Sequence, residues 1–94
     1  VEPGLDLAIC LAIASAITNR PLPPDLVAFG EVGLAGELRQ VAHTPRRLAE
    51  AARLRFRRAI APNNAPEFDS SSLRVVRVGS LPEALAAVGI TSRH

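Results

Sequence analysis

The sequence predicts one α+β domain. Three observations lead to this fold class: an apolar helical segment opens the chain, two extended runs enclose a glycine-bounded turn, and helical and extended patterns then alternate to the end. Ninety-four residues suffice for one domain or part of one, and 48% apolar residues are enough to form a core. We expect the domain to occupy residues 1–90 and the tail at 91–94 to fray.

The first helix is predicted at Gly4–Thr18, which is rich in Ala, Leu and Ile and follows Pro3, a residue suited to a helix start. Its interior polar residues, Asp6 and Ser15, are nine positions apart and fall on opposite sides of the helix. Because no polar face remains, we expect protein to cover this helix on most sides. Three prolines then enforce an extended connection: Pro21, Pro23 and Pro24.

A hairpin is predicted next. Leu26–Val32 is apolar except near its end and forms one strand, Gly33–Gly36 make a tight turn, and Glu37–Val41 return as a second strand. Glycines on both sides of the bend permit the positive φ angles that hairpin turns require.

A second helix follows the hairpin. Thr44 is predicted to cap it, Pro45 to occupy its first position, and the helix to run to about Leu54. We expect the inward stripe of this helix to consist of Leu48, Ala51 and Ala52.

The remaining elements are two strands and a helix. Short strands are predicted at Arg57–Ala61 and Leu73–Val78, separated by a polar loop. Ser80 and Glu83 have the spacing of a capping box, which predicts a last helix through Val88.

Two stretches resemble a known family. They are EPGLDLAICLAIASA with RPLPPDLVAFGEVGLAGELR, and RRLAEAARLRFRRAIAPNN. They resemble the C-terminal Lon-like domain of bacterial RadA/Sms, a RecA-like DNA repair and recombination ATPase. They are similar, less closely, to the Lon-like domain of the magnesium-chelatase/ComM group of AAA+ proteins, so that origin stays open as an alternative. The residues of the family's signature hairpin are Gly30, Glu31, Gly33, Gly36, Glu37 and Arg39.

The resemblance implies a fold and a partial domain. The fold is that of the Lon proteolytic domain, within the ribosomal protein S5 domain 2-like class. Family members have β-strands before the apolar helix with which this chain opens, so we expect the domain to be truncated at its N-terminus.

The resemblance also locates a protease dyad, which this sequence lacks. In active Lon domains the nucleophilic Ser follows a Pro just before the apolar helix, and its partner Lys lies in the first turn of the helix after the hairpin. Here Gly4 and Pro45 stand at these places, and all 11 basic side chains are Arg. A guanidinium stays protonated at working pH and cannot act as a general base. We expect no peptidase activity; a peptidase with an altered dyad is the rival hypothesis.

Other candidate catalytic or metal-binding residues have simpler explanations. Glu31 and Glu37 could act as paired carboxylates, but we expect both to serve the hairpin. His43 lacks companions for a metal site, and Cys10, the only cysteine, is expected to be a small core residue. We therefore predict no metal ligands.

A cluster of arginines is the strongest functional signal. With Glu50 as the only acid among them, residues 46–58 include Arg46, Arg47, Arg53, Arg55, Arg57 and Arg58. A positive surface of this kind suits contacts with DNA phosphates, without sequence specificity. A solvated or inter-subunit face is the open alternative. Three Phe, with no Trp or Tyr, do not favour a base-stacking platform.

The sequence thus predicts a non-catalytic scaffold, DNA-contact and oligomerisation domain of a RadA/Sms-type ATPase. Its expected partners are DNA and further copies of the parent protein. The resemblance implies that the parent assembles as a hexameric ring. ATP, magnesium and zinc are expected only in other parts of the parent, because this chain has no Walker A sequence and no Cys cluster. No apolar stretch approaches the ~20 residues of a membrane span, and we expect a cytoplasmic location.

Overall fold

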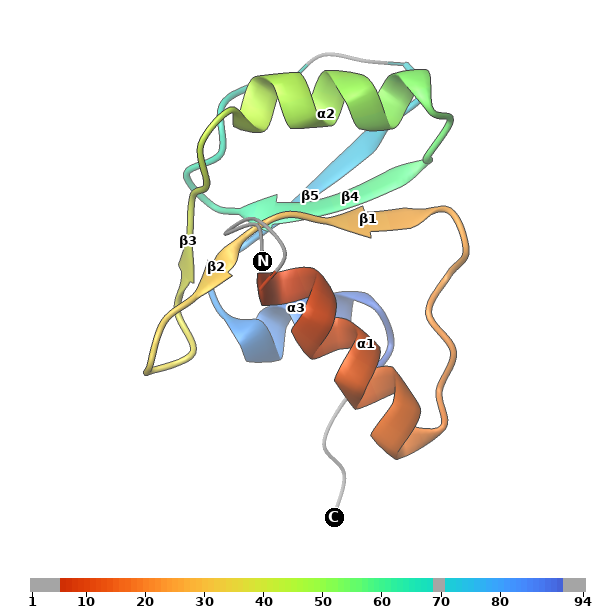
Figure 1. Cartoon of the computed structure of the whole chain (residues 1–94), viewed down its shortest axis with the longest axis vertical. Helices are drawn as coiled ribbons and strands as arrows, with labels where there is room; N and C mark the ends of the chain where they lie inside the picture. The colour runs from red at the N-terminus through yellow and green to blue at the C-terminus, as the bar shows by residue number, and fades with distance from the viewer. Residues whose placement is uncertain (1–5, 69–70, 91–94) are drawn as a thin grey trace.

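A parallel sheet lies between helices in the computed structural model, which describes residues 6–68 and 71–90 (Figure 1). In chain order the elements are α1 (Asp6–Thr18), β1 (Leu26–Ala28), β2 (Glu31–Val32), β3 (Leu38–Arg39), α2 (Thr44–Arg53), β4 (Arg58–Pro62), β5 (Arg74–Val78) and α3 (Leu81–Ala87). The sheet has the strand order β1-β4-β5, and β2 and β3 form a separate antiparallel hairpin. Helix α2 covers one face of the sheet, and α1 and α3 lie on the other.

The direction of strand pairing refines the predicted fold class. A mixture of helices and strands is confirmed, but β1, β4 and β5 all pair in parallel, which gives the domain α/β character. A parallel pair needs a crossover connection, and the segment containing α2 provides the one between β1 and β4. The sequence pattern predicts the order of elements, but strand direction depends on where each connection carries the chain.

The predicted single strand Leu26–Val32 is wrong, because the run divides between the two sheets. β1 pairs with β4, whereas β2 pairs with β3. At the junction, the Phe29 N–H donates to the Ile60 carbonyl (2.9 Å), and the Gly30 carbonyl accepts from the Leu7 N–H (3.0 Å). The start of α1 therefore takes a backbone position that a continuous ladder would use. The return strand is likewise shorter than predicted, since β3 contains only two residues.

The predicted N-cap of α2 is also wrong. His43 is the N-cap residue, with φ of 62°, and its side chain makes no cap hydrogen bond. Thr44 is the first helical residue and is 1% exposed; its hydroxyl donates to the Val41 carbonyl (2.8 Å). Thr44 therefore bonds back to the connection from within the helix and does not occupy the cap position. Leu48 and Ala51 are buried as predicted, whereas Ala52 is only half-buried.

The predicted cap of α3 is confirmed. The Ser80 hydroxyl accepts from the Glu83 N–H (3.3 Å), and the Glu83 carboxylate accepts from the Gly79 N–H (2.7 Å). The helix ends at Ala87, one residue earlier than predicted, and β4 begins and ends one residue later than predicted.

Two apolar clusters fill the two sides of the sheet. Between the sheet and helices α1 and α3, the buried residues are Leu7, Leu11, Ala28, Ile60, Val78 and Ala84. Between the sheet and α2, they are Phe29, Val41, Leu48, Ala51, Ala59 and Leu73. β4 contributes to both clusters, because successive residues of a strand point to opposite faces.

Helix α1 buries only part of its apolar surface. Leu7 and Leu11 pack into the core, and Cys10, predicted to be a core residue, is half-buried. Ile9, Ile13 and Ile17 are 44%, 54% and 79% exposed. These three residues are four apart and form one stripe, which we call the isoleucine stripe.

Substitution of Leu48 tests the core beneath α2. Leu48 is fully buried, so Leu48→Ala should lower the free energy of unfolding by about 2–5 kcal/mol in a urea titration. Leu34 is fully exposed at the hairpin tip, and Leu34→Ala should change that free energy by less than about 0.5 kcal/mol. Equal losses in the two variants would contradict this packing.

Candidate nucleic-acid interface

The signature hairpin is held by a carboxylate at its turn. Glu37 Oε1 accepts from the Ala35 N–H (3.1 Å), and Oε2 accepts from the Arg39 guanidinium (2.9 Å). A Cβ at Gly33 would clash with this carboxylate, so glycine leaves the space that Glu37 occupies. The Glu37 backbone N–H and then the Arg39 side chain lower the pKa of Glu37 below its ordinary value. Glu37 thus acts on the turn, as the sequence interpretation proposed.

The same hairpin joins elements that are distant in sequence. The Gly36 carbonyl accepts from the Leu81 N–H at the start of α3 (2.8 Å), and the Leu38 N–H donates to the Gly79 carbonyl (3.1 Å). Gly36 has φ of 86°, a conformation that glycine adopts without strain. Glu31 and Arg39 are register partners in the hairpin. The hairpin residues Gly30 and Gly36 therefore hold the starts of α1 and α3, respectively.

The structure describes one of the two positions at which the resemblance places a protease dyad. Gly4 lies outside the described residues. Pro45 is exposed in the first turn of α2, next to Arg46.

The predicted arginine cluster divides into two groups at opposite ends of α2. Arg46 and Arg47 occupy its first turn, and the Arg47 Nε donates to the Ala42 carbonyl (3.1 Å). The remaining four lie in or after the last turn: Arg53, Arg55, Arg57 and Arg58. Along the helix axis Arg47 and Arg53 are six residues apart, which at 1.5 Å per residue is ~9 Å.

Two arginines of the second group form ion pairs. The Arg53 Nε lies 3.2 Å from Glu50 Oε1, and this pair lowers the pKa of Glu50. The Arg58 guanidinium lies 3.5 Å from the Asp25 carboxylate. The Arg53–Glu50 pair is largely solvent-exposed and the Arg58–Asp25 pair partly so, so each contributes little to stability and can be rearranged by a ligand.

Parallel pairing places a further arginine, Arg74, beside Arg58 at the amino ends of the strands. Arg58 and Arg74 are register partners at the amino ends of β4 and β5. A cavity of about 500 Å³ is lined by arginines of the α2–β4 connection and by the two serines before β5, and a neighbouring one of about 420 Å³ includes Arg74. We call this surface the basic end; its polar residues are Arg53, Arg55, Arg57, Arg74, Ser71 and Ser72.

The sequence interpretation did not include Arg74, Ser71 and Ser72 among the candidate DNA-contact residues. Arg74 is nineteen positions from Arg55, and only the register of β4 with β5 brings the two regions together. The alternating Arg and Val residues of β5 indicate an exposed face but not its neighbours.

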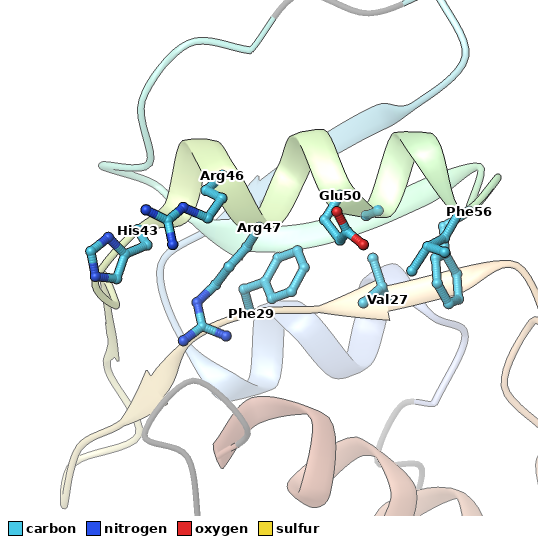
Figure 2. A pocket seen from close by; sticks show the side chains of 9 residues that line it. Val27, Phe29, His43, Arg46, Arg47, Glu50 and Phe56 are labelled. Atoms are coloured by element: carbon cyan, nitrogen blue, oxygen red, sulfur yellow. The ribbon is translucent and has the colours of Figure 1, made fainter.

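An apolar cavity of about 410 Å³ lies between α2 and β1 (Figure 2). Its walls are Val27, Phe29, Ala51, Leu54 and Phe56. Its rim is polar and consists of His43, Arg46, Arg47 and Glu50. In Figure 2, His43 and the two arginines lie at one end of the cavity and Phe56 lies at the other.

Within residues 6–68 and 71–90, no group of three His, Cys, Asp or Glu side chains is placed to hold a metal ion. None of the helices in these ranges has the length and apolar character needed to cross a membrane.

Comparison with known proteins gives the family. The sequence profile of the family described as subunit ChlI of Mg-chelatase matches residues 2–65, which contain the hairpin, α2 and β4. The chain belongs to this family. The chain is also 49% identical over 88 residues to DNA repair protein RadA of Haemophilus influenzae, covering 93% of the chain and 19% of that relative.

Further relatives have the same name. Identity to DNA repair protein RadA of Pseudomonas aeruginosa is 47% over 89 residues, covering 94% of the chain and 20% of the relative. Identity to DNA repair protein RadA of Synechocystis is 35% over 85 residues, covering 90% of the chain and 17% of the relative. The predicted resemblance to the RadA/Sms family is confirmed, and the chain spans about a fifth of the length of these relatives.

The pH dependence of stability tests the hairpin of this family. Because the folded-state pKa of Glu37 is lowered, its carboxylate stabilises the fold above the ordinary value of 4.5, and this contribution is lost as the pH falls through the folded-state pKa. Glu37→Gln should therefore be less stable than the wild type near pH 7, and the difference should shrink toward pH 3. Urea titrations at several pH values measure it; parallel pH profiles would contradict the assignment.

Proposed function

We propose that the chain is a non-catalytic, Lon-like scaffold domain that contacts the DNA backbone in a RadA-type DNA repair ATPase. The relatives named DNA repair protein RadA support the repair context. The activity of the whole protein lies largely in sequence outside this chain, which spans about a fifth of those relatives. The nucleotide and metal sites of the parent, and its cytoplasmic location, belong to the same proposal.

The basic end is the observation that supports DNA contact. It collects arginine side chains from the α2–β4 connection and from β5 around connected cavities, and it adds serine hydroxyls that can donate to phosphate oxygens. Arg57 lines both cavities. Guanidinium groups bind phosphate in a bidentate manner and keep their charge at every working pH, so such a surface binds the backbone without reading base sequence.

The absence of peptidase chemistry is part of the proposal. The chain contains no lysine to serve as the base, and proline occupies the helix position where the family's lysine is expected. The Lon-like fold then serves as a framework that holds α2 and the strand ends. The match to the ChlI profile supports the alternative of a chelatase-type parent, in which the same framework would serve a different AAA+ protein.

The scaffold role includes contact between copies. The isoleucine stripe lies on a helix whose only acidic residue is Asp6 at its start. A second copy would present an equally uncharged stripe, so two such helices could pack across a two-fold axis without burying a charge.

Salt dependence of DNA binding tests the basic end. Arg57→Gln should weaken binding to a fluorescein-labelled duplex and reduce the slope of log affinity against log salt by about 0.9, the value for one lost phosphate contact. Fluorescence anisotropy at several salt concentrations measures both quantities. Arg39→Gln removes the same charge from the exposed hairpin and should leave the slope unchanged. Equal slope losses in both variants would show a general charge effect and remove the basic end from the interface.

Substitution in the isoleucine stripe tests self-association. Ile13→Glu places a charge at the centre of an exposed face, so folding should be unaffected while association is lost. Sedimentation velocity should show an oligomer for the wild type at high concentration and a monomer for Ile13→Glu. Ile13→Val, which keeps the face apolar, is the control. A wild-type monomer at all concentrations would contradict this part of the proposal.

A further inference from the structure

The apolar cavity beside α2 has an unusual combination of walls and rim. Val27, Phe29 and Phe56 form part of an uncharged interior, while Arg46 and Arg47 stand at one end of the opening (Figure 2). A cavity of about 410 Å³ is in the range that holds a small organic group. The ligand that suits it joins a flat or apolar group to an adjacent anion.

The cavity lies next to the basic end. Phe56 lines both the apolar cavity and the 500 Å³ cavity that holds Arg53, Arg55 and Arg57. Cationic groups therefore stand on both sides of the apolar space, and the nearest two on α2, Arg47 and Arg53, are six residues or ~9 Å apart along the helix axis. An occupant with negative charges on both sides of an apolar group would satisfy both ends at once.

A nucleic-acid strand has this pattern of charge. Each base is flanked along the chain by two phosphates, and proteins that bind single strands combine a cationic groove with aromatic side chains on which bases stack. The few phenylalanines of the sequence did not favour such a platform, but the fold places two of the three, Phe29 and Phe56, around one cavity. Phe29 is buried, so Phe56 is the ring available for stacking.

We propose that the apolar cavity receives one base of single-stranded DNA, stacked on Phe56, while the flanking phosphates contact Arg46 and Arg47 at one end and the basic end at the other. This proposal deepens the DNA-contact function and rests on it. It assigns the cavity a role that duplex binding does not require, because the bases of a duplex are stacked on one another. A peptide with an apolar side chain between acidic residues is the competing occupant.

The experiment compares DNA with and without bases. A fluorescein-labelled oligo-dT strand, an abasic strand of the same length and a duplex are titrated with the 94-residue chain by fluorescence anisotropy. The wild type should bind oligo-dT about fivefold more tightly than the abasic strand, the lower end of what one base–aromatic stack contributes. Phe56→Leu keeps an apolar side chain without the ring and should remove this preference, leaving binding to the abasic strand unchanged.

Phe68→Leu is the matched control. Phe68 packs partly buried against the same core cluster as Phe56 but lines neither cavity, so this variant should keep the oligo-dT preference. If Phe56→Leu fails to fold, Leu54→Ser provides the second test, because Leu54 is 55% exposed at the cavity. Its control is Leu34→Ser at the exposed hairpin tip. The preference should fall in Leu54→Ser and persist in Leu34→Ser.

The outcomes separate this proposal from the one on which it rests. Equal binding of oligo-dT and the abasic strand by the wild type, with duplex binding retained, would overturn the base site and leave DNA contact standing. An unchanged oligo-dT preference in Phe56→Leu would also overturn it, because the base would then be bound elsewhere. Failure to bind any of the three DNAs would overturn both proposals.

Discussion

The parallel pairing of β4 with both of its neighbours is the interaction on which the structure depends. β4 lies at the centre of the sheet, and Ala59 and Ile60 pack into the clusters on opposite faces. Because all three strands run in one direction, their amino ends meet at one edge. That edge carries Arg58 and Arg74 in register, and the α2–β4 connection adds Arg55 and Arg57. A change in strand direction would disperse this charge.

The hairpin links the sheet to the starts of helices α1 and α3 through backbone hydrogen bonds. It leaves the sheet at Gly30, where the start of α1 is hydrogen-bonded, and its returning limb is bonded to the start of α3. The residues that identify the family are thus residues that hold backbone in place. These contacts satisfy backbone and turn geometry, and they need no lysine, which the chain lacks.

Helix α2 organises the candidate interface because its two ends have different surroundings. Its buried stripe fixes it against the sheet, and its exposed residues place cationic groups at both ends with an apolar cavity beside them. The exposed pair of Arg53 with Glu50 contributes little to stability, so the arginine remains accessible to a phosphate at little cost. Packing thus positions the helix, and solvent-exposed charge determines what it can bind.

The sequence by itself determined the family, most helices and strands, the hairpin residues and the absence of lysine, because these depend on local pattern and residue identity. It did not determine that Leu26–Val32 divides between two sheets, that Thr44 turns inward, or that Arg74 joins the α2–β4 arginines. The first and third depend on contacts between residues far apart in the chain, Gly30 with Leu7 and β4 with β5. The second depends on the path of the connection before α2, where the Val41 carbonyl accepts from the Thr44 hydroxyl. Local propensity carries no information on such contacts, so only the tertiary structure decided them.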